Sequence, residues 1–318
     1  MKKLSKQSTQ RRALSFQTEE RNLYYIVGSA NISTWMLSAV RRKILHSHTN
    51  ANPVTAKEKP NVTEDRPQPQ ILIRSFMKNN VVLITGGAKG IGRHAALTLA
   101  QAGAKLALAD TDVQRLHKTI AEIKSRGGDA FAIPTDVRDE KDVRHMVYEV
   151  FDRFGRVDAL INDAGIVPHF NWGIPRWPRA RFMSKDFWDS VIETNLGGTF
   201  LCTKYVVPFM EECRSGNIVN LWGGGRAENH GAAPYVVSKD AIRTFTRFIA
   251  EEEREWNVCV VAFSPKQAIA TEDAPEEARK RLPGPENLGN GFVLAAQAGM
   301  ELTGKTVEHQ NGKLVAVD

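Results

Sequence analysis

The sequence predicts an α/β protein whose core is a doubly wound parallel sheet. From residue 77 onward, short apolar runs of strand length alternate with helix-forming runs. The strand runs show little polar alternation, which is typical of strands buried on both faces of a parallel sheet. A glycine-rich turn joins the first strand directly to a helix. These observations together predict one α/β domain over residues 77–318, preceded by an extension over residues 1–76.

The expected elements follow in order along the chain. Strands are predicted at residues 81–85, 105–110, 130–134, 157–161, 217–221 and 258–263, with a last strand after residue 304. Helices are predicted from residue 90, around residues 116–123, over 139–154, from about 184 to 213 and from about 235 to 255. Because crossovers between parallel strands are right-handed, this order gives a Rossmann-type sheet.

The glycine turn reads Thr85-Gly86-x-x-x-Gly90-Ile91-Gly92. A strand, a tight turn and a helix start direct backbone N–H groups and the positive helix end toward a phosphate. The spacing differs from the usual Gly-x-Gly-x-x-Gly fingerprint, so a glycine-rich turn without a ligand remains an alternative.

Asp110 ends the second predicted strand, twenty-four positions after Gly86. A carboxylate there accepts hydrogen bonds from an adenosine ribose and repels a 2′-phosphate, which favours NAD over NADP. Lys89 would instead attract that phosphate, and Asp110 could simply open a turn. We expect the carboxylate to dominate, because a lysine side chain can move into solvent.

Residues 77–318 resemble the short-chain dehydrogenase/reductase family throughout. Beyond the glycine turn, the resemblance rests on Asp136-Val137, Asn162-x-Ala164-Gly165, Asn195, Tyr235-x-x-x-Lys239, Pro265, Ile269, Thr271 and Leu302-Thr303-Gly304, in this order and spacing. It implies catalytic roles for Tyr235, Lys239 and Asn195. It also implies cofactor contacts from Thr85, Gly86, Lys89, Gly90, Ile91, Gly92, Asp110, Asp136, Val137, Asn162, Ala164, Gly165, Tyr235, Lys239, Ile269 and Thr271.

The tyrosine and lysine suit the implied chemistry. A lysine four positions after a tyrosine lies on the same helix face, and its charge lowers the tyrosine pKa from about 10. Tyr235 would then exchange a proton with a substrate oxygen while nicotinamide exchanges a hydride. In the family, Lys239 would also hold the nicotinamide ribose and Asn195 would support a water relay. Asp136 would contact adenine, or alternatively cap the next helix.

The sequence departs from the family at the active-site serine. Counting thirteen residues back from Tyr235 places Trp222 at the serine position. Losing such a donor costs about 2.7–4 kcal/mol. A backbone N–H of Gly223 or Gly224 could substitute, as could Asn229 or His230; otherwise the site is impaired. Trp222, Gly223 and His230 are therefore candidate substrate-pocket residues.

Two further departures lie near the expected cofactor. Asp163 replaces the second asparagine of the family's Asn-Asn-Ala-Gly, and Lys266 replaces the glycine that usually follows Pro265. The first removes an amide donor. The second could change the position of the backbone near the nicotinamide carboxamide.

The charge lies mostly in the extension. Residues 1–76 contain 13 Lys or Arg and 5 Asp or Glu, whereas residues 77–318 contain 30 and 31. The near-neutral domain argues against nucleic acid as a partner. The basic start resembles a targeting sequence. Residues 23–40 are uncharged but diluted by polar side chains, so a membrane span is disfavoured, and a cytoplasmic protein is expected unless residues 1–48 target an organelle or membrane.

The sequence therefore predicts an NAD-preferring oxidoreductase that interconverts a secondary alcohol and a carbonyl, using a small-molecule substrate and no metal. Three widely spaced cysteines show no metal-ligand pattern. The resemblance implies a homodimer or homotetramer. The alternative is a catalytically impaired dinucleotide-binding protein, a sensor or scaffold that kept the cofactor site.

Overall fold

The computed structural model describes residues 77–169, 173, 175–223 and 231–317 of the chain. The extension, with its predicted targeting or membrane segment, lies outside these residues, as do Gly224, Asn229 and His230. Within the described ranges, no helix combines the length and apolar character needed to cross a bilayer.

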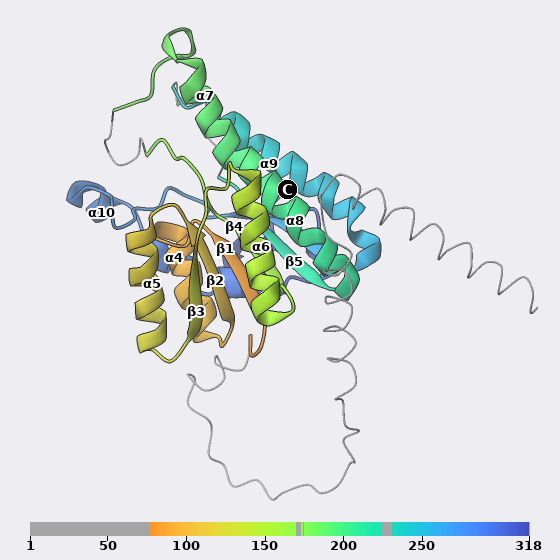
Figure 1. Ribbon diagram of the computed structural model, residues 1–318. Coiled ribbons are helices and arrows are strands. Elements are labelled where there is room, and N and C mark those ends of the chain that lie inside the picture. Colours follow the sequence, from red (N-terminus) through yellow and green to blue (C-terminus); the bar gives the residue numbers. More distant parts are fainter. Residues whose placement is uncertain (1–76, 170–172, 174, 224–230, 318) are drawn as a thin grey trace, which may run out of the picture. The chain divides into compact units, whose positions relative to one another are not determined.

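One eight-stranded sheet forms the centre of the domain (Figure 1). Its spatial order is β3-β2-β1-β4-β5-β6-β7-β8, and every neighbouring pair is parallel except β7 and β8. The strands are β1 (Val81–Thr85), β2 (Lys105–Asp110), β3 (Asp129–Pro134), β4 (Ala159–Asn162), β5 (Gly216–Leu221), β6 (Val258–Ser264), β7 (Thr306–Gln310) and β8 (Lys313–Ala316). The order reverses between β1 and β4, where open α/β sheets bind ligands.

Helices cover both faces of the sheet. The helices are α4 (Gly90–Gln101), α5 (Val113–Ser125), α6 (Glu140–Phe154), α7 (Lys185–Ile192), α8 (Gly198–Cys213), α9 (Ala233–Glu252), α10 (Glu276–Arg281) and α11 (Gly291–Ala295). Short 3₁₀ turns lie at Ala180–Phe182, Arg254–Trp256, Pro285–Leu288 and Met300–Leu302.

Alternate strand residues supply two separate apolar cores. Val82 and Ile84 of β1 join the core formed with α4, α5 and α11. Val81 and Leu83 join the opposite core, formed with α6 and α8. Burial on both faces explains why the strand runs lack alternation in the sequence. The predicted doubly wound parallel sheet is confirmed.

Two features differ from the expected elements. The predicted helix over residues 184–213 is interrupted by a π-helical segment, Glu193–Gly197. The last strand is followed by an antiparallel partner, β8, across Asn311 and Gly312, whose φ angles are 50° and 76°. Asn-Gly with two positive φ angles is the favoured two-residue hairpin turn. The Asn-Gly pair is visible in the sequence. The strand β8 was nevertheless not predicted, because a doubly wound parallel sheet does not require an antiparallel strand at its edge.

Candidate active site

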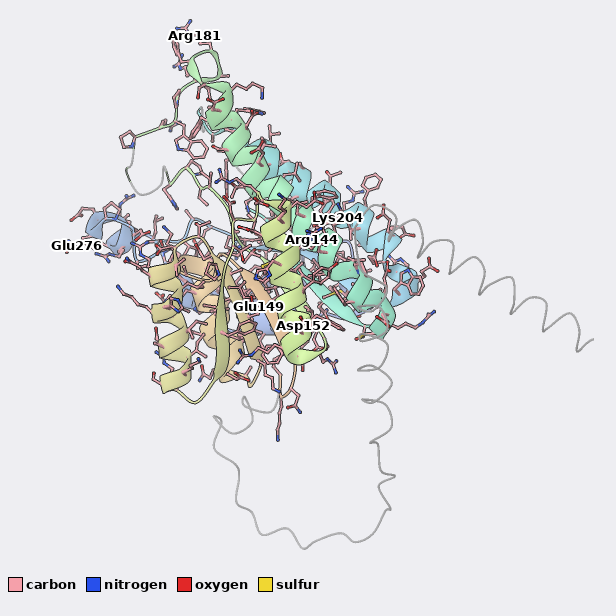
Figure 2. All side chains as sticks on the ribbon, in the orientation of Figure 1. Arg144, Glu149, Asp152, Arg181, Lys204 and Glu276 are labelled. Carbon is pink, nitrogen blue, oxygen red and sulfur yellow. The ribbon has the colours of Figure 1, made fainter. Side chains whose placement is uncertain are left out.

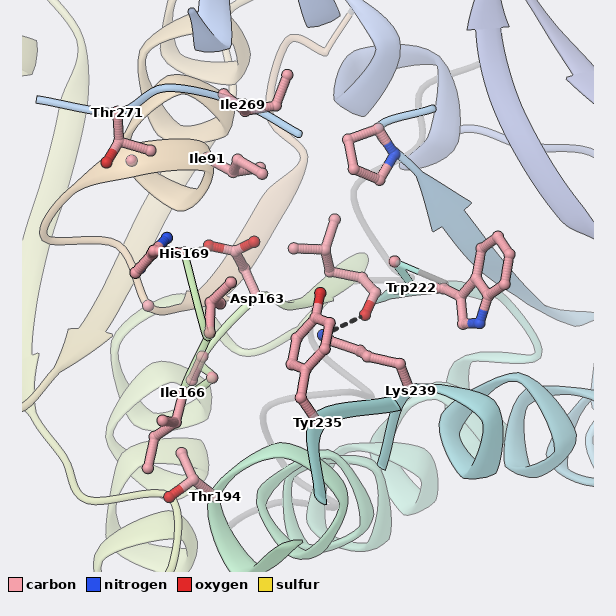
Figure 3. A pocket seen from close by; sticks show the side chains of 18 of the residues that line it. Ile91, Asp163, Ile166, His169, Thr194, Trp222, Tyr235, Lys239, Ile269 and Thr271 are labelled. Carbon is pink, nitrogen blue, oxygen red and sulfur yellow. Dashed lines mark hydrogen bonds between the residues drawn. The ribbon is translucent and has the colours of Figure 1, made fainter. Parts of the chain in front are cut away.

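A pocket of about 770 Å³ opens at the carboxyl ends of the central strands (Figure 3). Residues following β1, β2, β3, β4, β5 and β6 line it, as expected for a switch-point crevice. The predicted cofactor residues that line it are Gly86, Lys89, Gly90, Ile91, Asp110, Asp136, Val137, Ala164, Gly165, Tyr235, Lys239, Ile269 and Thr271. The fold therefore brings most of the predicted set together around one cavity.

Thr85, Gly92 and Asn162 do not line the pocket. The Thr85 hydroxyl accepts a hydrogen bond from the Ala164 N–H at 3.3 Å. The Asn162 amide donates to Asn220 Oδ1 at 2.8 Å inside the sheet. We therefore expect these residues to brace the pocket wall rather than to face a nucleotide.

The glycine turn needs its glycines for close packing. A Cβ on Gly86, which has a φ of 75°, would lie 2.8 Å from the Ala164 nitrogen. A Cβ on Gly92 would lie 2.2 Å from the Gly86 oxygen. Both contacts are with backbone atoms that cannot yield, so only glycine lets the turn, α4 and the β4 loop meet. Helix α4 begins at Gly90, and its N-terminus borders the pocket.

Asp110 is fixed beside this turn by two backbone donors. Its Oδ2 accepts from the Ala88 N–H at 3.1 Å and its Oδ1 accepts from the Asp112 N–H at 2.9 Å. The carboxylate is thereby held at the pocket edge with lone pairs left for a ribose. Asp110 thus keeps the position that the sequence predicts for the adenosine end.

Asp136 also lines the pocket, but its carboxylate is engaged. The Arg138 guanidinium donates to both of its oxygens, and these hydrogen bonds lower the Asp136 pKa. The alternative that Asp136 caps the next helix is wrong, because Asp139 accepts the N–H groups of Lys141 and Asp142 at the start of α6.

Two acidic residues after β6 contact the glycine turn, and the sequence analysis did not single them out. Glu272 Oε2 accepts a hydrogen bond from the Gly90 N–H at 3.0 Å. Asp273 pairs with Lys89 at 2.7 Å and with Arg115 at 2.9 Å. Their only sequence signal is an acidic pair directly after Thr271, which is ordinary for an exposed loop.

Tyr235 and Lys239 meet at the other end of the pocket, on α9. The Lys239 ammonium donates to the Leu221 carbonyl at 2.7 Å and lies 5.9 Å from the centre of the Tyr235 ring (Figure 3). Burial lowers the pKa of Lys239. Burial, with a smaller effect of the Asp163 charge, raises the pKa of Tyr235 to about 12. This direction is opposite to the lowering predicted from the Tyr-x-x-x-Lys spacing, because desolvation outweighs the lysine charge.

Asn195 lies fully buried in the π-helical segment. Its Oδ1 accepts from the Ile166 N–H at 2.7 Å, and its amide donates to the Ser238 hydroxyl at 3.0 Å. Ser238 is the neighbour of Lys239 in α9. Asn195 thus connects the β4 loop to the helix that carries the tyrosine and lysine. π-Helical turns are frequent at functional sites.

The structure shows which residue faces the tyrosine hydroxyl. A Cβ on Gly223 would lie 2.9 Å from Tyr235 Oη. The Trp222 indole points away from Tyr235 in Figure 3, and the Arg243 guanidinium lies 5.5 Å from its ring. Counting residues placed Trp222 at the serine position, whereas the strand end presents Gly223 to Tyr235. The predicted candidate His230 lies outside the described residues.

Asp163 is a buried carboxyl in the pocket wall (Figure 3). Its carboxylate is held by the Gly92 N–H, and its Oδ1 is buried without a hydrogen-bond partner among the residues described. Burial raises its pKa, and the Lys239 charge partly opposes that shift. Over the same described ranges, no cluster of His, Cys, Asp and Glu has the arrangement of a metal site.

The parallel sheet, the glycine turn and the tyrosine–lysine pair in one pocket define a class of nucleotide-dependent oxidoreductases. Residues 80–281 match the short chain dehydrogenase family. The chain belongs to the short-chain dehydrogenase/reductase family.

Curated relatives agree with this assignment. The chain is 33% identical over 244 residues to a 3-oxoacyl-(acyl-carrier-protein) reductase of Staphylococcus aureus, covering 72% of this chain and 96% of that protein. It is 35% identical over 193 residues to the BbsD subunit of the (2S)-((R)-hydroxy(phenyl)methyl)succinyl-CoA dehydrogenase of Thauera aromatica, covering 59% of this chain and 73% of that subunit.

Solved structures are similar as well. The crystal structure of levodione reductase superposes with a TM-score of 0.61 at 27% identity, covering 69% of this chain and 91% of that one. NAD⁺-bound xylitol dehydrogenase superposes with a TM-score of 0.55 at 30% identity, covering 59% and 70%. Membership in this family makes the chain an oxidoreductase by class, with a nucleotide-binding Rossmann fold.

Proposed function

We propose that this protein is an NAD-preferring oxidoreductase that interconverts a secondary alcohol and a carbonyl compound, with Tyr235 as the acid/base. One observation carries the proposal: Tyr235 and Lys239 line the same cavity as Gly86 and Gly90, which belong to the glycine turn that suits a phosphate group. The similarity to an NAD⁺-bound xylitol dehydrogenase and to reductases supports the same reaction class.

Each end of the pocket has a distinct task. The turn and the α4 N-terminus would hold the pyrophosphate, and Asp110 would accept the ribose hydroxyls. A nicotinamide held in this pocket would supply or accept the hydride exchanged with the substrate carbon. Tyr235 donates a proton to the carbonyl oxygen in reduction and accepts it in oxidation. Lys239, fixed by the Leu221 carbonyl, places its positive charge beside the tyrosine ring, where it would oppose the desolvation that raises the Tyr235 pKa.

The preference for NAD over NADP rests on Asp110. Its carboxylate lies at the pocket edge and is fixed by the Ala88 and Asp112 N–H groups, so it cannot readily turn away. A fixed carboxylate accepts hydrogen bonds from a free ribose but repels a 2′-phosphate.

A specific observation favours a second function. Gly223 stands against the Tyr235 hydroxyl and carries no hydroxyl to hold a substrate oxygen. A binding protein with little turnover, acting as a sensor or scaffold, would keep the nucleotide end and tolerate this loss. In the enzyme, the Gly223 N–H is our candidate for the missing donor.

Turnover separates the two functions. The full chain is titrated with NADH and NADPH, and absorbance at 340 nm is then followed with a panel of ketones and secondary alcohols. We expect dinucleotide binding and measurable turnover with NAD(H). Binding without turnover across the panel would favour the sensor function, and the absence of binding would contradict both functions.

We further propose that the protein is a homodimer or homotetramer through α8 and α9. Phe200 on α8 and Phe248 on α9 are 47% and 67% exposed, and Val237 on α9 is 49% exposed. Apolar side chains gathered on neighbouring helices suit a contact with a second copy. Light scattering coupled to size exclusion should give two or four times the chain mass of 35.4 kDa.

A further inference from the structure

Asp273 links two cations that belong to different elements. Its Oδ2 accepts from the Lys89 ammonium at 2.7 Å and from Arg115 Nη1 at 2.9 Å. Its Oδ1 lies 2.9 Å from Arg115 Nη2, so the arginine pairs with both oxygens. Such bidentate pairs are the strongest and most directional of the charge-assisted hydrogen bonds. The Asp273 carboxylate thus restrains both Lys89, in the glycine turn, and Arg115, in the first turn of α5.

These cations flank the adenosine end of the pocket. Lys89 precedes Gly90 in the turn and, like Asp110 and Asp273, lines the cavity. Arg115 lies one turn into α5, the helix that follows Asp110. Arg115 does not itself line the cavity, but it is joined to the lining residue Asp273, so without Asp273 both cations would be available at this edge of the pocket. Arginine and lysine are the side chains that bind phosphate groups.

The charges at this end sum to an anionic environment. Around the glycine turn the cations are Lys89 and Arg115, and the carboxylates are those of Asp110, Asp112, Glu272 and Asp273; the Asp136–Arg138 pair, which also lines the pocket, adds no net charge. Asp112 lies 3.6 Å from Arg115, and Glu272 accepts from the Gly90 N–H. A dianionic 2′-phosphate would meet four carboxylates and two cations that are already paired.

We propose that Asp273 is a determinant of cofactor specificity: by holding Lys89 and Arg115, it withholds from NADP the two cations that would bind a 2′-phosphate. This inference rests on the proposed dinucleotide-dependent function. Two carboxylates would then cause the preference for NAD. Asp110 would repel a 2′-phosphate, and Asp273 would occupy the two cations that could attract it. A 2′-phosphate would have to compete with Asp273 for Lys89 and Arg115.

The strength of the bridge fits this role. The Lys89 hydrogen bond, followed by that of Arg115, lowers the pKa of Asp273, although partial burial opposes them. The side chains of Lys89, Arg115 and Asp273 are 48%, 41% and 31% exposed, so solvent screens the attraction. The bridge is therefore firm enough to bias nucleotide choice and open enough for a bound phosphate to replace it.

The test compares dissociation constants of NAD⁺ and NADP⁺ for the wild type and Asp273→Asn by isothermal titration calorimetry. Asparagine keeps the size of the side chain and removes its charge. We expect NADP⁺ to bind Asp273→Asn about tenfold more tightly than it binds the wild type, because two phosphate-binding cations become available. NAD⁺ affinity should change less than threefold. The pair 2′,5′-ADP and 5′-AMP should show the same selectivity, which places the effect at the 2′-phosphate.

Glu276→Gln is the matched control. Glu276 lies three positions further on, at the start of α10, and its side chain projects away from the sheet in Figure 2. It pairs with Lys280 at 3.0 Å and makes the same change in net charge when substituted. A control that raises NADP⁺ affinity as much as Asp273→Asn would reduce the effect to overall charge and overturn the inference.

A double variant identifies the cations. Adding Arg115→Gln to Asp273→Asn should remove most of the gained NADP⁺ affinity, since the released guanidinium is gone. If the gain is unchanged in the double variant, or if Asp273→Asn leaves the NADP⁺ to NAD⁺ ratio as in the wild type, the inference fails while the proposed function stands. If the wild type binds neither nucleotide, the proposed function itself fails. Far-ultraviolet circular dichroism confirms that each variant is folded.

Discussion

The nucleotide end and the chemical end of the pocket are built differently (Figure 3). At the nucleotide end, Asp110 and the glycine turn are fixed by backbone hydrogen bonds and close backbone contacts. At the chemical end, the tyrosine hydroxyl faces a glycine, Gly223, and burial, with a smaller effect of the Asp163 carboxyl, raises the tyrosine pKa. The nucleotide end is therefore fixed mainly by backbone contacts, whereas the proposed proton transfer depends on a few side chains that differ from the family pattern.

Phosphate binding and proton transfer depend on the sequence in different ways. Backbone N–H groups bind phosphate whatever the side chains, provided that glycines allow close approach. A proton donor requires one particular side chain with a suitable pKa. Substitution at the chemical end should thus change turnover strongly and nucleotide binding weakly, and substitution at the nucleotide end should do the reverse.

The largest effect is expected for Tyr235→Phe, which removes only the hydroxyl. If Tyr235 is the acid/base, turnover should fall about a thousandfold, within the usual range for a positioned proton donor. NADH affinity should stay within threefold, because the ring remains in place. Steady-state rates and NADH titrations measure both quantities. A variant that retained more than a tenth of wild-type turnover would exclude Tyr235 as the proton donor.

Gly223→Ser and Gly223→Ala separate the effect of a hydroxyl from that of a side chain. Both place a Cβ 2.9 Å from the Tyr235 hydroxyl, so both require the tyrosine to shift, and this shift by itself should lower turnover equally in the two variants. Only serine adds a donor, and it should be about tenfold faster than alanine. Equal rates for the two variants would show that no hydroxyl is used at this position.

Trp222→Ser is the companion variant for the same question. The Trp222 indole points away from Tyr235, so a serine there should not raise turnover (Figure 3). A clear rise would instead support the assignment made by counting residues back from the tyrosine.

Asp163→Asn tests the buried carboxyl through the pH dependence of stability. Burial raises the folded-state pKa of Asp163 from 3.8 to about 7. Between these values the unfolded chain has released the proton that the folded chain keeps, so this residue makes the wild type less stable as pH rises. Asparagine has no such dependence. The unfolding free energy of the variant relative to wild type should rise by about 4 kcal/mol from pH 4 to pH 8.

Urea unfolding at several pH values measures this difference. Asp129→Asn is a suitable control, because Asp129 is exposed at the start of β3. A stability difference for Asp163→Asn that is constant with pH would mean that the carboxyl ionises in the folded protein as it does in water.

The sequence predicts the fold because each strand buried on both faces is a run of apolar residues that can be recognised locally. The second strand, residues 105–110, is found with the predicted bounds, since its apolar run ends at a charged residue on each side. The break at Glu193–Gly197 was not predicted, because weak helix formers such as Thr194 and Gly197 do not by themselves specify a π turn, and in this turn Asn195 bonds Ile166 and Ser238. Those partners come from other elements.

The same reasoning explains what the sequence predicts of the site. Short motifs place Gly86, Asp110 and Tyr235 around one pocket, because each follows the end of a strand or lies on a fixed helix face. The bridge, by contrast, joins Asp273 to Lys89 and Arg115, which lie 184 and 158 positions earlier in the chain. No short motif could have indicated it. The desolvation that raises the Tyr235 pKa is likewise a property of the assembled pocket and not of the Tyr-x-x-x-Lys spacing.

Asp110→Asn sharpens the comparison from the nucleotide end. Asparagine keeps one acceptor oxygen but loses the charge that we expect to hold the ribose. NAD⁺ should bind about tenfold more weakly, as expected for a lost charge-assisted hydrogen bond. Turnover at saturating NAD⁺ should change less than threefold, since Tyr235 is untouched. A large loss of turnover at saturation, with unchanged affinity, would contradict the division between the two ends.

The smallest effect is expected for Lys266→Gly, at the edge of the chemical end. Lys266 stands where the family usually has glycine, and its φ is 67°. A left-handed conformation costs an L-residue about 1–2 kcal/mol, and the greater freedom of unfolded glycine offsets about 0.5–1 kcal/mol of the gain. Lys266→Gly should therefore stabilise the protein by about 0.5 kcal/mol, measured by urea unfolding.

Lys78→Gly is the matched control, since Lys78 is an exposed turn residue without a positive φ. It should destabilise slightly, because glycine only adds freedom to the unfolded chain there. Opposite signs for the two lysines would show that the chain tolerates a strained backbone at Lys266, beside the pocket. Equal destabilisation would mean that the backbone at Lys266, in this part of the chemical end, is unstrained.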